Sequence, residues 1–173
     1  MKSKRVRPKV RIEDYISLLI DKAPYPFSGG LCSSLPLAKP GVYTIWKGAQ
    51  FLYVGTAGRA WKDDLNPKRM KGIKDRLDSH WNGRRSGSTL ALSVWDRLVM
   101  PDLSAEQRRQ VASGHLDPNI ATKDYIRKHL SYRFIVLDSY AEALEIEKRF
   151  RAGETQLGLP LLNPHRSYKK RRS

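Results

Sequence analysis

Two short runs rich in β-branched and aromatic residues stand out in the first third of the chain. They cover residues 41–46 and 51–55, and the segment between them contains Gly48. Strand-forming residues on both sides of a short glycine-containing turn predict a β-hairpin. A third strand is predicted over residues 132–137, where aromatic and β-branched residues again predominate.

Apolar residues recur at helical spacing elsewhere. Residues 12–20 form one such pattern, which predicts a short helix. A late helix is expected to begin at Ser139, because Ser139 and Glu142 have the spacing of a capping box. Residues 89–99 contain alternating and β-branched positions, which predict a further strand or extended segment. The remaining predicted helices lie at residues 71–81, at a segment beginning within 104–109, and at 122–130.

This order of elements predicts the fold class. A hairpin and a helix are followed by an insertion, and then by a strand and a helix. Together they predict an α+β domain built around a small, largely antiparallel sheet. A length of 173 residues fits one domain. We assign that domain to residues 12–164, with the insertion at about residues 84–130.

Basic residues are concentrated at the two ends of the chain. The sequence holds 33 basic and 17 acidic residues, a formal charge of +16. Residues 1–11 carry six basic side chains and residues 165–173 carry five, with no acid in either segment. Such flexible cationic arms bind polyanions by displacing counterions, although a solubility tail or a contact with an anionic membrane would have the same composition. Neither arm shows a basic amphipathic helix, so nucleic acid is the favoured partner.

Cysteine usage and hydropathy bear on the cellular setting. Cys32 is the only cysteine, which excludes an intramolecular disulfide and a cysteine-based zinc site. No signal peptide is expected behind the basic start, and no run of roughly 18 apolar residues predicts a membrane span. These features favour a reducing, cytoplasmic setting.

The hairpin carries one tyrosine on each strand, Tyr43 and Tyr53. Strands are rich in tyrosine, so packing is the commoner role for such residues. A two-residue turn at Gly48-Ala49 would place Tyr43 opposite Val54 and the phenols on opposite faces. A three-residue loop would pair Tyr43 with Tyr53, and an equivalent bulge would also put both on one face. A shared function requires one of these last two arrangements, and we expect it.

Two polar residues share a face of the helix predicted at residues 71–81. Arg76 and His80 are one turn apart. Beside an apolar stripe they are most simply a solvated flank. A guanidinium can instead clamp phosphate oxygens, and an imidazole can accept or relay a proton near neutral pH.

The last predicted helix carries three glutamates in different surroundings. Glu142 has a capping role, and Glu145 is expected to face solvent, about 200° around the helix from Glu147. Glu147 has apolar neighbours one turn before and after it. A carboxylate in an apolar stripe needs a compensating charge, which an ion pair, for example with Arg76, or a divalent cation would supply.

Taken in order, these segments resemble the GIY-YIG nuclease family. Residues 41–43 and 53–55 match the two triplets that name it, with Val42 and Val54 in place of the isoleucines. The ordered set is more specific than any single motif and covers about residues 40–164. The other matches are residues 71–81, with the arginine and histidine, 143–150, with the glutamate, and 161–164, with the closing asparagine.

The resemblance implies a three-stranded sheet flanked by helices and a one-metal phosphodiesterase site. Tyr43 would deprotonate the attacking water, or assist its deprotonation, supported by Tyr53 or His80. Arg76 would stabilise the extra negative charge, and Glu147 would hold a divalent metal, Mg²⁺ or alternatively Mn²⁺.

The resemblance and the nearby loops also suggest supporting residues. Asn163 would steady the glutamate helix or the floor of the site. Arg59, Arg84 and Arg85 lie on nearby loops. Each of them could grip the DNA backbone or be a plain surface charge, and the two explanations are equally good.

The expected function is a metal-dependent endonuclease that hydrolyses DNA, in restriction and defence or in repair. The insertion is the candidate for target reading, and a homodimer would allow both strands to be cut. The alternative, from another class, is a nucleic-acid-binding protein without catalysis that uses the same scaffold and basic arms.

Overall fold

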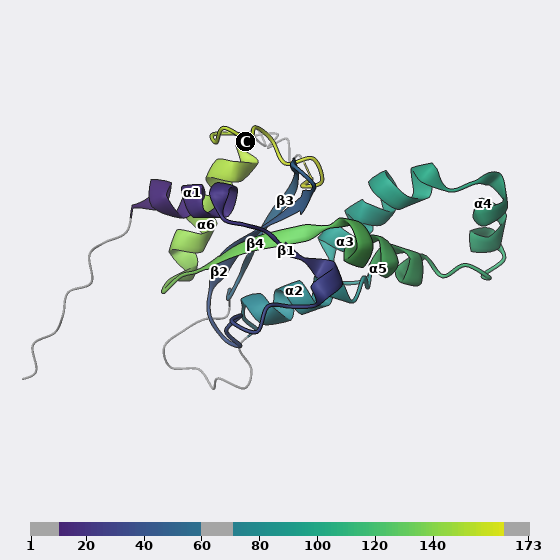
Figure 1. The fold of residues 1–173 in the computed structure, drawn as a ribbon, viewed down its shortest axis with the longest axis horizontal. Coiled ribbons are helices and arrows are strands. Elements are labelled where there is room, and N and C mark those ends of the chain that lie inside the picture. The colour runs from purple at the N-terminus through teal and green to yellow at the C-terminus, as the bar shows by residue number, and fades with distance from the viewer. Residues whose placement is uncertain (1–10, 60–70, 165–173) are drawn as a thin grey trace, which may run out of the picture.

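A small antiparallel sheet forms the centre of the protein (Figure 1). The computed structural model describes residues 11–59 and 71–164. The strands lie in the order β1-β4-β2-β3, and all neighbouring pairs are antiparallel. They are β1 (Tyr25–Pro26), β2 (Gly41–Lys47), β3 (Gln50–Ala57) and β4 (Ser131–Val136). The α+β class, the hairpin and the late strand are confirmed, whereas the expectation of three strands is wrong because the sheet has four.

The additional strand, β1, contributes two residues at the edge of the sheet. Tyr25 pairs with Tyr132, and Pro26 pairs with Ser131. Proline lacks a backbone N–H and is therefore suited to an edge position. So short a segment has no alternation that the sequence could reveal. The predicted basic arms, apart from Arg11, lie outside the described residues.

Helices cover both faces of the sheet (Figure 1). On one face, α1 (Ile12–Asp21) and α6 (Tyr140–Arg151) share a buried apolar cluster with Val42 and Val54. On the other face, α2 (Ile73–Trp81) and α5 (Pro118–His129) share a second cluster with Tyr43 and Tyr53. Neighbouring strand residues divide between the two clusters because successive side chains in a strand point to opposite faces.

Residues 89–99 of the insertion are helical, contrary to the extended segment expected there. The insertion contains α3 (Thr89–Val94), the π-helical segment η3 (Trp95–Val99), the short η4 (Met100–Asp102), α4 (Ala105–Ala112) and then α5. In Figure 1 these helices extend away from the sheet, with α4 at the far end.

The reason for this error is visible in the burial pattern. Ser88 accepts a hydrogen bond from the backbone N–H of Ala91 and so caps α3. The buried positions that follow include Leu90, Val94 and Val99, which recur at helical intervals. Val94 and Val99 therefore lie on the buried face of a helical segment, and their strand propensity is overridden by packing.

The hairpin places both tyrosines on one face through a bulge. Its turn has two residues, because Lys47 pairs with Gln50. The register then shifts between Ile45 and Trp46, so that Tyr43 lies opposite Gly55. The expected direct pairing of Tyr43 with Tyr53 is wrong, but the equivalent bulge is present and has the expected effect.

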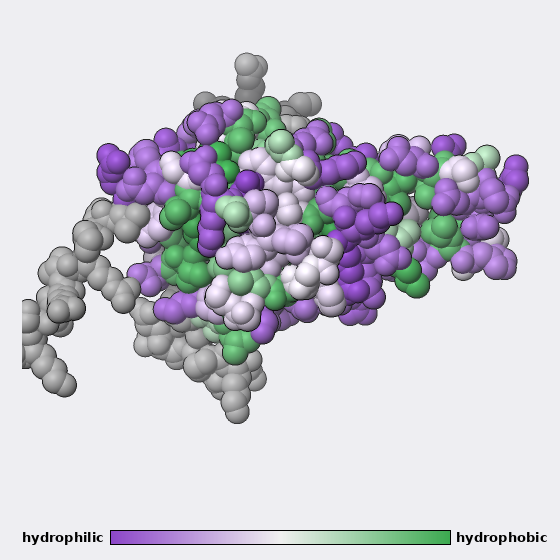
Figure 2. Space-filling view, in the orientation of Figure 1, coloured by the Kyte–Doolittle hydropathy of each residue, from purple (hydrophilic) through white to green (hydrophobic). Residues whose placement is uncertain are grey.

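Polar and charged residues cover most of the projecting insertion in the view of Figure 2. Apolar side chains are still exposed at scattered positions, such as Leu92, Met100 and Ile120. Within residues 11–59 and 71–164, no helix combines the length and the apolar character needed to cross a membrane.

Candidate functional site

The two hairpin tyrosines are buried together beneath α2. Their ring centroids lie 6.3 Å apart, with an angle of 24° between the ring planes. A Cβ atom at Gly55 would lie only 2.3 Å from the hydroxyl oxygen of Tyr43 and 3.0 Å from the ring of Tyr53. The glycine therefore leaves the space into which the Tyr43 phenol projects.

A continuous hydrogen-bonded chain runs from Tyr43 into the insertion. The hydroxyl of Tyr43 lies 2.8 Å from Nε2 of His80, and Nδ1 of His80 lies 2.8 Å from Oγ of Ser88. All three side chains are buried. His80 comes from α2 and Ser88 from the residue that caps α3, so the chain joins strand β2 to two helices.

Burial keeps both aromatic members of this chain neutral. It raises the pKa of the Tyr43 phenol far above its ordinary value, more than the nearby Arg76 charge lowers it. Burial, with a smaller contribution from Arg76, lowers the pKa of His80 to about 3. His80 therefore carries no charge at neutral pH and is a poor acceptor of a further proton.

Arg76 lies beside both phenols. It is half-buried, and its guanidinium donates a hydrogen bond of 3.5 Å to the backbone oxygen of Gly87. Its positive charge lowers the pKa of Tyr43 and of Tyr53, although burial still keeps both above their ordinary value. Arg76 thus favours a phenolate at both tyrosines, and Arg151 adds a smaller effect of the same sign at Tyr53.

Glu147 approaches from α6, which covers the opposite face of the sheet, and reaches the edge strand β3. Its side chain is 17% exposed, and its ion-pair partner is Arg151 at 3.7 Å. Burial raises the pKa of the carboxyl, while Arg151, Arg76 and the hydroxyl of Thr56 lower it by smaller amounts. Glu147 thus lies in the electrostatic field of Arg76, close to the end of β3.

The two other glutamates of α6 behave as the sequence predicts. Glu142 donates its backbone N–H to the hydroxyl of Ser139, which caps the helix. Glu145 is 51% exposed and faces Lys148 at 3.9 Å. One expected apolar neighbour of Glu147, Leu144, is exposed, so Glu147 lies at the border of the buried stripe and not inside it.

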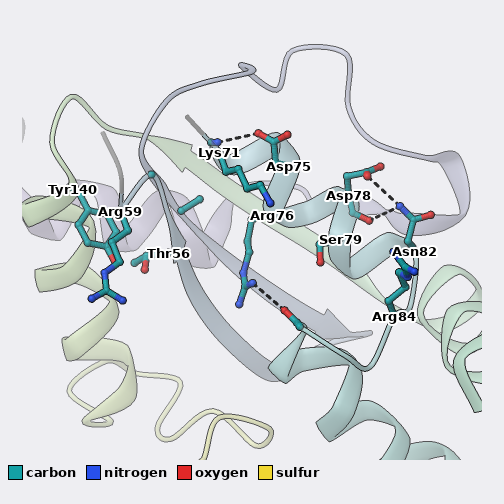
Figure 3. A pocket seen from close by; sticks show the side chains of 14 residues that line it. Thr56, Arg59, Lys71, Asp75, Arg76, Asp78, Ser79, Asn82, Arg84 and Tyr140 are labelled. Atoms are coloured by element: carbon teal, nitrogen blue, oxygen red, sulfur yellow. Dashed lines mark hydrogen bonds between the residues drawn. The ribbon is translucent and has the colours of Figure 1, made fainter. Parts of the chain in front are cut away.

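An open cleft of about 840 Å³ adjoins this group of residues (Figure 3). Arg76 and Thr56 belong to its wall. Arg59 and Tyr140 lie together at one end in Figure 3, and Arg84 lies at the other end, beyond α2. With Lys71, the basic residues of the wall number four.

Two acids also line the cleft, but both are used within α2. Asp75 accepts a 2.9 Å hydrogen bond from the backbone N–H of Gly72, at the start of the helix. Asp78 accepts a 3.0 Å hydrogen bond from the side chain of Asn82, near its end. Both carboxylates keep their charge, but the four cations outnumber them, so the wall of the cleft is net positive and favours an anion.

The structure places Arg85 and Asn163 in defined contacts. Arg85 does not line the cleft, and its guanidinium lies 5.2 Å from the ring centre of Trp95. Of the two positions expected for Asn163, the glutamate helix and the floor of the site, its hydrogen bonds are to β3, the strand that carries Tyr53. The Asn163 side chain accepts from the N–H of Val54 at 2.8 Å and donates to the oxygen of Val54 at 2.9 Å. It thereby covers the free edge of the strand that carries Tyr53.

The structure also identifies residues that the sequence analysis missed. Ser88 is the partner of His80, and Thr56 is the partner of Glu147. A helix predicted to start after Ser88 would have marked that serine as a cap, although not as a neighbour of His80. Nothing in the sequence pattern singles out Thr56.

The described part of the chain holds no group of three or more His, Cys, Asp or Glu side chains arranged to bind a metal. The available oxygen ligands are the Glu147 carboxylate and the neighbouring Thr56 hydroxyl. The arrangement thus combines a buried phenol, a neutral imidazole, a guanidinium and one carboxylate beside a basic cleft. No protein-family model, curated protein or solved structure matches the chain in comparisons with known proteins.

Proposed function

We propose that the protein is a metal-dependent endonuclease of the GIY-YIG type that hydrolyses DNA. One observation carries this proposal. Tyr43, Tyr53, Arg76, His80 and Glu147 come from separate segments, and their side chains interact around the end of β3. A purely structural domain has no need to bring these five together beside a cationic cleft.

Arg76 is the residue best suited to bind the scissile phosphate. Its planar guanidinium matches two phosphate oxygens, and it lies between the buried phenols and the open cleft. The same charge would stabilise the extra negative charge of the transition state.

Tyr43 is the candidate for the proton acceptor at the attacking water. A phenol that burial makes a weaker acid needs added positive charge before it can act at neutral pH. Arg76 supplies part of that charge, and the ring of Tyr53 lies next to Tyr43 on the same face of the sheet.

The residues around Glu147 fit a divalent cation. A carboxylate whose pKa is raised by burial, and whose ion-pair partner is as far as 3.7 Å, gains from a further positive charge. Carboxylate and hydroxyl oxygens are ligands that Mg²⁺ accepts, and Mn²⁺ binds similar sets. Glu147, with Thr56 beside it, would hold the ion, which when bound would neutralise charge on the leaving oxygen.

The rest of the cleft supports an extended polyanion as the substrate. Arg59 and Arg84 flank Arg76 on opposite sides, which suits a phosphate backbone that continues past the bond to be cut. A cytoplasmic location is part of this proposal. A restriction or defence role and a repair role both remain consistent with such a cleft.

The test is cleavage of supercoiled plasmid with Mg²⁺ and with chelator. We expect Mg²⁺-dependent nicked or linear products, with linear products indicating that both strands are cut, as a homodimer would do. Glu147→Gln should lower the rate on the order of 10²- to 10³-fold. Glu145→Gln, on the same helix but facing solvent, is the matched control and should cleave normally. A wild-type protein that retains plasmid but never cuts it would instead support the non-catalytic alternative.

A further inference from the structure

Arg151 and Glu147 form an ion pair within α6 that is more sheltered from solvent than its neighbour on the same helix. Their charged groups lie 3.7 Å apart, and their side chains are 32% and 17% exposed. In the Lys148–Glu145 pair, the side chains are 78% and 51% exposed. Water and salt therefore screen the charge of Arg151 less than they screen that surface pair. Of the charges that lower the pKa of Glu147, Arg151 has the largest effect.

The guanidinium of Arg151 is also held from a second side. Its Nη2 donates a 3.2 Å hydrogen bond to the backbone oxygen of Pro164, while Nη1 faces Glu147. Pro164 follows Asn163, which is fixed to β3 by two hydrogen bonds with Val54. Two contacts to one planar group restrict its rotation. The structure thus keeps a positive charge beside the carboxylate that is the candidate metal ligand.

A divalent cation at Glu147 would compete with this charge. The separation of 3.7 Å leaves the carboxylate oxygens able to accept a further cation. Arg151 and Arg76 nevertheless both act on Glu147, so two guanidiniums already face one acid. Each of them repels an added cation, and the repulsion is stronger in a partly buried site than in open water. The affinity for the cation should therefore depend on Arg151.

We propose that Arg151 is an internal counter-ion that competes with a divalent cation for Glu147 and thereby lowers the affinity of the candidate metal site. This inference rests on the proposed function. A DNA phosphate beside Arg76 would add negative charge and offset the two guanidiniums. The cation would then bind more tightly, because Mg²⁺ shares phosphate oxygens in sites with few carboxylates. Until then, Arg151 keeps the carboxylate paired within the protein.

Binding of Mn²⁺ without DNA tests the role of Arg151 separately from cleavage. Mn²⁺ is titrated at about pH 8, well above the usual range of a carboxyl group. Paramagnetic broadening of the Thr56 and Glu147 amide signals reports the bound ion. Arg151→Gln, which removes the charge, should bind Mn²⁺ about fivefold more tightly, the upper end of the effect of a partly exposed ion pair. Arg151→Lys keeps the charge and should bind as the wild type does.

Two other variants on α6 serve as controls. Arg149→Gln removes an arginine of similar exposure, 29%, which pairs with Glu13 at 3.0 Å, and it should leave the Mn²⁺ affinity unchanged. Glu147→Gln should abolish the broadening at Thr56. Equal affinities of Arg151→Gln and the wild type would reduce the pair to a plain helical contact and overturn the proposal. Weaker binding by Arg151→Gln would also overturn it, because Arg151 would then orient the carboxylate and not compete for it.

Cleavage supplies a second measurement, which depends on the proposed function. In Arg151→Gln, the Mg²⁺ concentration that gives half of the maximal rate should fall about fivefold, independently of the maximal rate itself. In Arg149→Gln it should not change. An unchanged Mg²⁺ requirement in Arg151→Gln would contradict the role of Arg151 in the reaction. Absence of cleavage in every protein, together with the expected Mn²⁺ affinities, would contradict the endonuclease function alone. Absence of Mn²⁺ binding in every protein would contradict the metal site and this inference with it.

Discussion

Tyr43 and Gly55 are cross-strand partners, and the phenol of the first projects into the space that a side chain on the second would need. The bulge between Ile45 and Trp46 creates this pairing, since the unbulged two-residue hairpin would set Tyr43 against Val54. Backbone register and side-chain size at one position thus determine where the candidate general base lies.

Substitution of Gly55 tests that relationship. Gly55→Ala should displace the Tyr43 ring and lower the free energy of unfolding by about 1–3 kcal/mol, as overpacking of a core does. Gly29→Ala is the control, because a Cβ there meets no atom within 4 Å. Urea unfolding of both variants measures the difference, and equal stabilities would contradict the steric account.

Removal of one hydroxyl tests the role of Tyr43. Tyr43→Phe keeps the packed ring but should abolish Mg²⁺-dependent cleavage while leaving retention of DNA nearly unchanged. Tyr125→Phe, which loses a surface contact with Lys47, is the control and should cut normally. Undiminished cutting by Tyr43→Phe would remove this residue from the mechanism.

Adjacent arginines predict opposite phenotypes. Arg84 lines the cleft, so Arg84→Ala should weaken DNA binding. It should also reduce the slope of the logarithm of the binding constant against the logarithm of salt concentration by about one, the value for one lost phosphate contact. Arg85 lies over Trp95, so Arg85→Ala should leave that salt dependence unchanged and lower stability instead. Titration of labelled duplex DNA at several salt concentrations distinguishes them, and a reversed result would move the DNA path to the other side of this loop.

The buried imidazole predicts an acid-sensitive fold. The unfolded chain binds a proton at a histidine near pH 6.5, whereas the folded protein resists it until about pH 3. Stability should therefore fall as the pH drops below about 6.5, by up to about 1.4 kcal/mol per pH unit from this group. Glu147, whose pKa is raised by burial, contributes with the opposite sign.

Comparison with a variant isolates the histidine term. Between pH 7.5 and 5.0, the wild-type protein should lose about 2 kcal/mol more than His80→Gln in urea unfolding. His115→Gln, which alters an exposed histidine, should behave as the wild type does. Parallel curves for the wild-type and His80→Gln proteins would mean that His80 is already able to ionise in the fold.

The edge of the sheet supplies a further test. Asn163→Ala removes two hydrogen bonds to Val54 and should cost about 1–3 kcal/mol, because the buried backbone groups of that residue lose their partners. Hydrogen exchange at the Val54 amide should become faster. Asn82→Ala, at the end of α2, is the control and should leave that amide protected.

Local patterns predict much of this fold. Alternation and aromatic content identify β2, β3 and β4, and the capping spacing at Ser139 identifies α6, because these signals depend on neighbouring residues alone. The shared helical face of Arg76 and His80 also follows from spacing. The difference in exposure between Glu145 and Glu147 follows from helical spacing as well.

Other features depend on contacts between distant segments. The bulge that aligns the two phenols has no local signature, and the two-residue β1 forms only because β4 is present beside it. The helical state of residues 89–99 could have been predicted from the spacing of Leu90 and Val94 and from the cap at Ser88. The partnership of Ser88 with His80 could not, because it requires α3 to be packed against α2.

The contact between Ser88 and His80 joins the insertion and the candidate site into one structural unit. Any chimaera that replaces residues 84–130 with a segment of different specificity would also remove the hydroxyl next to His80. Grafts that begin after Ala91 would retain the capping turn. We expect them to preserve the candidate site, whereas exchange of the whole insertion would not. Engineering a new target preference should therefore start beyond the first turn of α3.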